Sequence, residues 1–273
     1  MHRIMCPPTF FEIEYVINPW MDLGIKVDRA LAHQQWSSFV AVLRALGDTV
    51  DFVDPDPRCP DMTFSGDAGL VFDNIFVPSN FRVRERVLEV EHYTNWFRAR
   101  GYTIRPLDQS IAFEGLGDVI FFGNRAIFGH GVRSDLRSLD TLKELIPELR
   151  ILAHLKIVDD RFFHLAMALA FLDESTVIYY PPAFDEESVT LLKTAVPGAL
   201  AVSEEDATRY FACNNVVVGR KVLLDNCTQE LRRALEKRNF EVVPCAMSEF
   251  KKSGGSLRCL VLSFIGKQPC VAA

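Results

Sequence analysis

Phe113–Gly129 has the sequence FEGLGDVIFFGNRAIFG, in which two apolar runs flank the dipeptide Gly-Asn. A Gly-Asn pair between β-forming residues predicts a two-residue hairpin turn. The segment before the first run carries two carboxylates, Glu114 and Asp118, separated by Gly-Leu-Gly. We therefore expect two short apolar strands that follow an acidic loop.

Similar apolar runs recur along the chain, and a reactive or polar residue stands near the start of each one. These residues are Asp67, Asp118, His164, Asn214 and Cys259, spaced by 45 to 51 residues. A near-constant period in this range is typical of radially arranged or stacked repeats. The spacing therefore predicts that the two aspartates, the histidine and the cysteine occupy equivalent positions around one centre.

Helical patterns alternate with these hairpins. Apolar residues at helical spacing predict helices over 27–46, 81–100, 139–146, 185–194 and 228–238, and further short strands are expected at 1–8, 49–53 and 259–264. The hairpin strands are apolar on both faces, as in strands covered by helices. The sequence thus predicts one α/β domain over residues 1–265, with short mixed sheets around an axis, helices outside, and a flexible tail over 266–273.

Composition limits the partners of the protein. The chain of 273 residues carries a net charge of −6, which argues against nucleic acid or an anionic membrane as the main partner. It has no apolar run of about eighteen residues, so no membrane span is expected. Seven scattered cysteines without a CxxC pair disfavour a zinc site or a disulfide framework and favour the reducing cytoplasm. A small-molecule partner is expected, and a homo-oligomer is left open.

Cys259 and His164 are the candidates for covalent chemistry. The Cys follows a Gly-Gly loop, and Arg258 beside it favours the thiolate. A buried structural cysteine is the alternative. His164 stands among aromatic residues, where a packed histidine is common, but a cysteine nucleophile needs a histidine as proton carrier.

The acids of the repeat indicate the charge of the ligand. Carboxylates bind a planar guanidinium in bidentate geometry, so Asp67, Glu114 and Asp118 around one centre favour a cationic guanidino compound. Solvated loop acids are the alternative. Asn18 lies in an aromatic-rich stretch, Tyr15–Met21, that is either a packed surface loop or a lid over a ligand.

Six segments in order resemble the guanidine-modifying (pentein) superfamily, above all dimethylarginine dimethylaminohydrolases and the catalytic domain of bacterial arginine dihydrolases. They are MCPP at 5–8, YVINPWM at 15–21, FEGLGD at 113–118, FHL at 163–165, FACN at 211–214 and GGSLRC at 254–259. The resemblance runs from about Ile4 to Phe264. It implies a five-bladed α/β propeller, in agreement with the repeat.

The resemblance also implies roles for individual residues. Cys259 corresponds to the nucleophile and His164 to the proton shuttle. Glu114 or Asp118 corresponds to the acid that holds the guanidinium and orients the histidine, and Asp67 to the second guanidinium-binding acid.

The remaining implied contacts concern the rest of the substrate. Arg133 is expected to hold the substrate carboxylate, with Arg86 as the second candidate. Asn18 matches the flexible loop near the substrate.

Two positions depart from the dihydrolase pattern. Ala166 stands where deiminases, dihydrolases and amidinotransferases carry the Asp of an HxD motif, and Asp67 stands where dihydrolases carry Asn. A methylated nitrogen would leave such an Asp partly unpaired, at a cost of about 1–3 kcal/mol. The departures therefore favour an N-substituted arginine.

The implied reaction is hydrolysis of a guanidino C–N bond through a covalent thiouronium on Cys259, giving citrulline and an amine, without metal or organic cofactor. An arginine deiminase or dihydrolase and an amidinotransferase are alternatives. A non-catalytic ligand-binding relative, with Ala166 as the mark of lost activity, is a further alternative.

Overall fold

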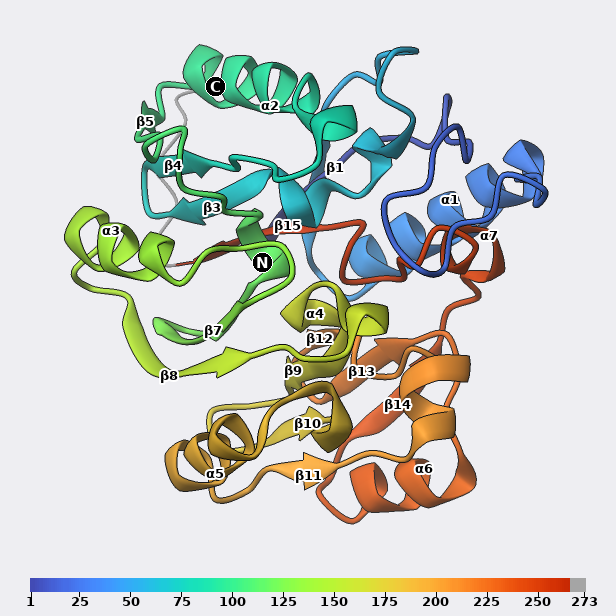
Figure 1. Cartoon of the computed structure of the whole chain (residues 1–273). Helices are drawn as coiled ribbons and strands as arrows, with labels where there is room; N and C mark the ends of the chain where they lie inside the picture. The colour runs from blue at the N-terminus through green and yellow to red at the C-terminus, as the bar shows by residue number, and fades with distance from the viewer. Residues whose placement is uncertain (266–273) are drawn as a thin grey trace.

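The computed structural model of the protein describes residues 1–265 (Figure 1). Its sheets are built from one repeated unit, which is an antiparallel hairpin, a helix, and a third strand parallel to the second. This pairing occurs five times among the described residues. The predicted repeat is therefore a structural one.

Four units follow one another along the chain. They contain β3 (Gly69–Phe72), β4 (Ile75–Pro78), α2 (Glu89–Ala99) and β5 (Thr103–Ile104); β6 (Val119–Phe122), β7 (Arg125–His130), α3 (Arg137–Leu145) and β8 (Arg150–Lys156); β9 (Leu169–Phe171), β10 (Val177–Tyr179), α5 (Glu186–Ala195) and β11 (Leu200–Ala201); and β12 (Val216–Val218), β13 (Lys221–Leu224), α6 (Gln229–Glu236) and β14 (Glu241–Pro244). The short helices α4 (Leu165–Ala168) and α7 (Ser248–Lys251) precede β9 and β15.

The fifth unit combines the two ends of the described chain. β15 (Leu262–Ile265) pairs antiparallel with β1 (His2–Met5), and β2 (Thr49–Phe52) pairs parallel with β1 after the helix α1 (Arg29–Ala45). β15 also pairs in parallel with β3, so two units share one six-stranded sheet. The structure thus confirms an α/β fold of short mixed sheets, with one sheet of six strands and three sheets of three among residues 1–265.

The first strand of each unit lies inside, and the longer helices lie at the periphery (Figure 1). β3, β9 and β15 are buried at every residue. α1 illustrates how a covering helix forms. The carboxylate of Asp28 caps its first turn by accepting from the N–H of Leu31, and its apolar stripe is buried.

Two predicted boundaries are wrong for a physical reason. The helix expected over 81–100 begins only at Glu89, because the backbone N–H of Arg82 bonds to the carboxylate of Glu114 and the side chain of Arg86 turns inward to acids. The last strand begins at Leu262 rather than at Cys259, which lies in a turn. The tail predicted over 266–273 lies outside the described residues. None of the described helices has the length and apolar character that crossing a membrane requires.

Two glycines with positive φ allow a test of how closely the units pack. Gly123 (φ +59°) forms the predicted hairpin turn, and a Cβ there would meet nothing within 4 Å. Gly115 (φ +55°) packs against the preceding unit, where a Cβ would lie 2.5 Å from the carbonyl oxygen of Gly69. Close approach of two loops therefore requires glycine at 115.

We expect Gly123→Ala to lower the free energy of unfolding by about 1–2 kcal/mol, the cost of a left-handed residue with a Cβ. Gly115→Ala should lower it by clearly more, because the Cβ also overlaps backbone. Urea denaturation of both variants measures the difference. Equal losses would contradict the close packing at Gly69.

Candidate active site

Four ionisable side chains meet where the first strands of the units begin. Asp67 lies in the 3-10 turn before β3, and Glu114 precedes the 3-10 turn before β6. His164 is the residue before α4, and Cys259 lies in the turn that leads into β15. Each is at most 3% exposed. The fold therefore brings together residues that lie far apart in the sequence. The repeat predicted this for Asp67, His164 and Cys259, but it named Asp118 rather than Glu114 as the fourth residue.

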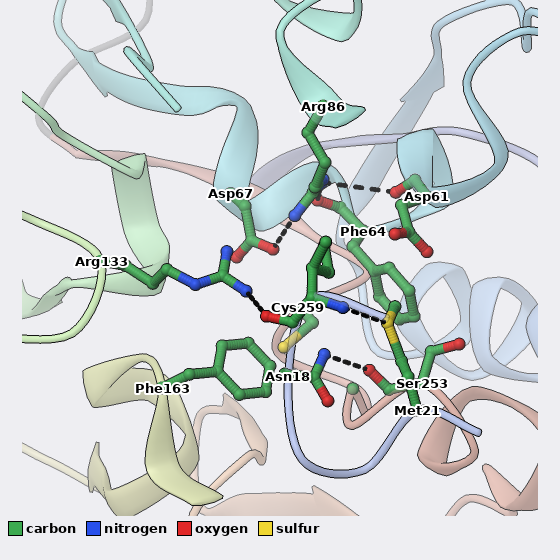
Figure 2. Close-up of a pocket in the computed structure, with 12 residues that line it drawn as sticks. Asn18, Met21, Asp61, Phe64, Asp67, Arg86, Arg133, Phe163, Ser253 and Cys259 are labelled. Atoms are coloured by element: carbon green, nitrogen blue, oxygen red, sulfur yellow. Dashed lines mark hydrogen bonds and ion pairs between the residues drawn. The ribbon is translucent and has the colours of Figure 1, made fainter. Parts of the chain in front are cut away.

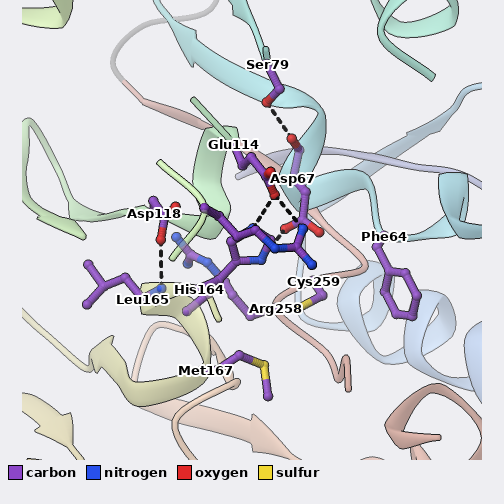
Figure 3. Close-up of polar contacts among 12 residues, drawn as sticks. Phe64, Asp67, Ser79, Glu114, Asp118, His164, Leu165, Met167, Arg258 and Cys259 are labelled. Carbon is purple, nitrogen blue, oxygen red and sulfur yellow. Dashed lines mark hydrogen bonds and ion pairs between the residues drawn. The ribbon is translucent and has the colours of Figure 1, made fainter. Parts of the chain in front are cut away.

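His164 lies between two carboxylates (Figure 3). Its Nε2 is 2.7 Å from Oε2 of Glu114, and its Nδ1 is 3.6 Å from Oδ1 of Asp67. Burial disfavours the imidazolium, but the charge of Asp67 and the hydrogen bond of Glu114 outweigh it and raise the pKa of His164. The ring is thus suited to hold a proton and deliver it.

Glu114 is the acid that orients His164. Its Oε2 also accepts from Nη1 of Arg133 at 2.9 Å, and its Oε1 accepts from the backbone N–H of Arg82 at 3.0 Å. Burial opposes ionisation, yet Arg133 and His164 lower the pKa of Glu114 to about 2. Glu114 is therefore a carboxylate at neutral pH.

Asp118 accepts hydrogen bonds from backbone N–H groups instead of contacting the side chain of His164. Its Oδ1 accepts from the N–H of Leu165 at 3.0 Å, and its Oδ2 accepts from the N–H of Ser134 at 3.1 Å. Burial raises the pKa of Asp118 to about 6. The sequence left open which of the two acids orients His164; the geometry gives that contact to Glu114, while Asp118 fixes the backbone that follows the histidine.

Asp67 is paired on its other side with Arg86. Nη1 of Arg86 lies 2.6 Å from Oδ2 of Asp67, and its Nε and Nη2 hold Glu89 in a fork at 2.9 and 2.8 Å. All three side chains are at most 4% exposed. Oδ1 of Asp67 has no hydrogen-bond partner among the described residues. One oxygen of this acid is therefore available to a ligand.

Asn214 holds the turn that carries Cys259. Its Nδ2 donates to Sγ of Cys259 at 3.1 Å, and its Oδ1 accepts from the N–H groups of Ser256 and Arg258, both at 3.1 Å. Burial and the charge of Asp67 raise the pKa of Cys259 to about 12, which the N–H of Ser256 and the amide of Asn214 oppose. Without a cationic ligand Cys259 is a thiol.

A narrow cavity lies beside Asp67 and Cys259 (Figure 2). Its free volume is about 20 Å³, close to what one water molecule occupies. Nη2 of Arg133 donates to the carbonyl of Ile17 at 2.7 Å, and Nδ2 of Asn18 donates to the carbonyl of Ser253 at 3.1 Å. These bonds fix the Tyr15–Met21 segment, of which Ile17, Asn18 and Met21 line the cavity.

Asp61 also lines the cavity, although no sequence pattern singled it out. It is 1% exposed, and its carboxylate interacts with the hydroxyl of Tyr15, which belongs to the Tyr15–Met21 segment. Burial raises the pKa of Asp61 to about 6. The sequence around Asp61 is a Pro-rich turn, and nothing in it distinguishes a buried aspartate from a solvent-exposed one. Only the fold shows that Asp61 lies at the cavity.

Comparison with known proteins agrees with this arrangement. The profile of a family described as N,N dimethylarginine dimethylhydrolase, eukaryotic, matches residues 12–265. The chain belongs to the dimethylarginine dimethylaminohydrolase family. It is 36% identical over 258 residues to the N(G),N(G)-dimethylarginine dimethylaminohydrolase of Mycobacterium tuberculosis, which covers 94% of this chain and 84% of that protein.

This dimethylaminohydrolase-family chain is also similar to arginine dihydrolases. It is 36% identical over 264 residues to the bifunctional arginine dihydrolase/ornithine cyclodeaminase AgrE of Nostoc sp., covering 95% of this chain but 37% of that longer protein. The substrate-bound N-terminal domain of ArgZ, a cyanobacterial arginine dihydrolase, matches the fold with a TM-score of 0.92 and 33% identity over 97% of this chain and 98% of that domain. A further structure holds a variant of that domain covalently bonded to a reaction intermediate. The predicted resemblance is confirmed.

Replacing Asn214 by Ala removes the donor to Sγ of Cys259. A hydrogen bond to a charged group contributes about 1.5–3 kcal/mol, so we expect iodoacetamide alkylation of Cys259 at a given pH to slow about tenfold or more. The rate of modification of this residue is followed by mass spectrometry between neutral and alkaline pH.

Asn215→Ala is the matched control. Asn215 follows Asn214 in the sequence and is also buried. Its side-chain amide donates to the carbonyl of Ala212, and among the described residues it has no hydrogen bond to Cys259. This variant should lose stability and keep the alkylation profile of the wild type. Equal slowing in both variants would mean that Asn214 is only structural.

The raised pKa of His164 sets a pH dependence of stability. Its protonated form contributes stability fully below the ordinary value of about 6.5, and the contribution disappears as the pH rises through the higher folded-state value. Above about pH 6.5, the free energy of unfolding of the wild type should therefore fall with pH more steeply than that of His164→Gln. Urea denaturation at each pH provides both slopes, and identical slopes would contradict an imidazolium paired with Asp67 and Glu114.

Proposed function

We propose that the protein hydrolyses the guanidino group of an N-methylated arginine to citrulline and an amine. The observation that carries this proposal is the single buried site at which Cys259, His164, Glu114 and Asp67 meet beside one cavity. Cleavage of a C–N bond at a cationic carbon needs a nucleophile, a proton carrier and negative charge in this arrangement.

Asp67 and Asp61 would bind the positive groups of the substrate. Oδ1 of Asp67, which has no hydrogen bond among the described residues and lies 3.6 Å from Nδ1 of His164, suits a guanidinium N–H. Oδ2 of the same acid already binds the guanidinium of Arg86. The buried carboxylate of Asp61, which lines the cavity, suits the α-ammonium group. Two separate acceptors in one cavity favour an amino acid over a simple guanidine.

Arg133 would hold the substrate carboxylate once the Tyr15–Met21 segment moves. A cavity of about 20 Å³ cannot admit arginine, so this segment has to open for the substrate to bind. Opening breaks the bond from Arg133 to Ile17 and releases Nη2 for a carboxylate, while Nη1 stays on Glu114. Arg86 already has all its nitrogens engaged and is the second candidate.

The chemistry follows from the charges. The substrate cation beside Cys259 offsets the effect of burial and Asp67 and lowers the pKa of the thiol, which then attacks the guanidino carbon as thiolate. His164 protonates the leaving amine and then removes a proton from water that attacks the thiouronium, which releases citrulline. Proximity and proton transfer provide most of the rate, and Glu114 keeps the ring oriented throughout.

Ala166 supports the preference for a methylated nitrogen. It is 1% exposed on α4, two residues after His164, and its carbonyl accepts from Nδ2 of Asn214. An Asp at this place would need a donor that a methylated nitrogen lacks. The similarity to ArgZ and AgrE favours arginine itself as the second candidate substrate.

We extend the proposal to the whole described chain. If β15, β1 and β2 are counted as one blade and β3 to β5 as another, the five repeated units form a five-bladed propeller in which residues 1–265 are a single catalytic domain. The six cysteines of the described residues are free thiols, which supports a cytoplasmic location.

Product analysis tests the proposed reaction. The protein is incubated separately with arginine, monomethylarginine and asymmetric dimethylarginine, and citrulline, ornithine, ammonia and methylamines are quantified. We expect citrulline with methylamine or dimethylamine from the methylated substrates, and a lower kcat/KM with arginine. Ornithine from arginine would favour the dihydrolase alternative, and absence of every product would refute hydrolysis.

Cys259→Ser and Cys227→Ser form a matched pair for the nucleophile. Quenched wild-type reactions should show a covalent adduct on Cys259 by mass spectrometry. Cys259→Ser should lose at least about 10³-fold in kcat, whereas Cys227→Ser, remote in sequence and absent from the cavity lining, should stay active. Full activity of Cys259→Ser would exclude the assigned nucleophile.

A further inference from the structure

A second cluster of reactive side chains lies outside the catalytic cavity. Asp56, Cys59 and His92 each offer a ligand atom, and these atoms lie within 4.8 Å of one another. Nε2 of His92 is 3.1 Å from Oδ2 of Asp56. The proposed hydrolysis uses none of these three residues.

Local structure preorganises the three side chains. The N–H of Cys59 bonds to the carbonyl of Asp56 at 3.0 Å, so a tight turn sets these two residues side by side. The backbone N–H and Nε of Arg58 hold Oδ1 of Asp56 at 2.8 and 2.9 Å, which fixes the carboxylate and leaves Oδ2 facing His92. His92 comes from α2, so the cluster joins two elements.

We propose that Asp56, Cys59 and His92 bind one Zn²⁺ ion, with water as the fourth ligand. Thiolate, imidazole and carboxylate are the three ligand types that zinc takes in proteins, and Mg²⁺ or Ca²⁺ would not select a thiolate. A thiolate and a carboxylate together neutralise the charge of the ion. The cysteine spacing gave no sign of this site because only one ligand is a cysteine.

The degree of exposure fits a site that exchanges its ion with solvent. Cys59 is 2% exposed, Asp56 and His92 have side chains 13% and 28% exposed, and the ion would enter from their side. A cysteine ligand gives up its proton when zinc binds, so the affinity for zinc should increase with pH.

Arg58 is the competitor for this site. Its Nη2 lies 2.6 Å from Oδ2 of Asp56, the same oxygen that would bind zinc. The Arg58 side chain is 66% exposed, so the guanidinium is able to turn into solvent while the backbone N–H stays on Oδ1. Zinc binding thus replaces Nη2 of Arg58 and the contact of His92 with Asp56.

The experiment uses the full chain with Cys259→Ser, so that the nucleophile cannot bind the metal. Zinc chloride is titrated against a chromophoric chelator, and Co²⁺ is added separately, since a thiolate ligand gives a ligand-to-metal absorption band. We expect one ion per chain and a Co²⁺ spectrum with thiolate character. Absence of stoichiometric binding, or a Co²⁺ spectrum without thiolate, would overturn the proposal.

Variants locate the ion. Cys59→Ser should abolish the thiolate band. His92→Gln changes a part-exposed side chain, so the variant should fold. Its zinc affinity should fall by more than the ~10- to 100-fold that is lost when a residue hydrogen-bonded to a metal ligand is removed. Arg58→Gln should strengthen binding because it removes the competitor. Cys227→Ser and His33→Gln, which lie outside the cluster, are the matched controls. Unchanged affinity in His92→Gln, or weaker binding in Arg58→Gln, would place the ion elsewhere.

Discussion

Two arginines neutralise the acids at the centre of the molecule, and the rest of the structure is arranged to keep them there. Arg86 bridges Asp67 and Glu89, while Arg133 holds Glu114. Charges buried this deeply are tolerated only when they are paired and hydrogen-bonded, because loss of one partner leaves the other uncompensated. This constraint explains the irregular chain before α2, where a continuous helix would carry Arg86 away from Asp67.

The repeated unit also keeps the reactive side chains in fixed positions. The segments that carry Asp67, Glu114, His164 and Cys259 are short, buried and tied to neighbouring backbone. Asp118 fixes the residue after His164, and Asn214 fixes the turn of Cys259. Side chains held this way need little rearrangement when charge develops in a reaction.

The fold and the centre of the site were predictable because they follow from repetition. A spacing near fifty residues located Asp67, His164 and Cys259 near the starts of equivalent strands, and the Gly-Asn pair located the hairpin turn at Gly123. The sequence could not separate the roles of Glu114 and Asp118, since both lie in one flexible loop and only the observed contacts distinguish them. Asp61 was missed altogether, because its burial depends on elements distant in the chain.

The pairing of β15 with both β1 and β3 has a consequence for biosynthesis. Residues 262–265 close a unit whose other strands, His2–Met5 and Thr49–Phe52, leave the ribosome long before them. Such long-range pairing forms late because the ends of a long loop have to meet first. Cys259 reaches Asp67 and His164 only with that last step, so a nascent or truncated chain holds the acids and the histidine without the thiol. Assembly of the centre thus coincides with completion of the fold.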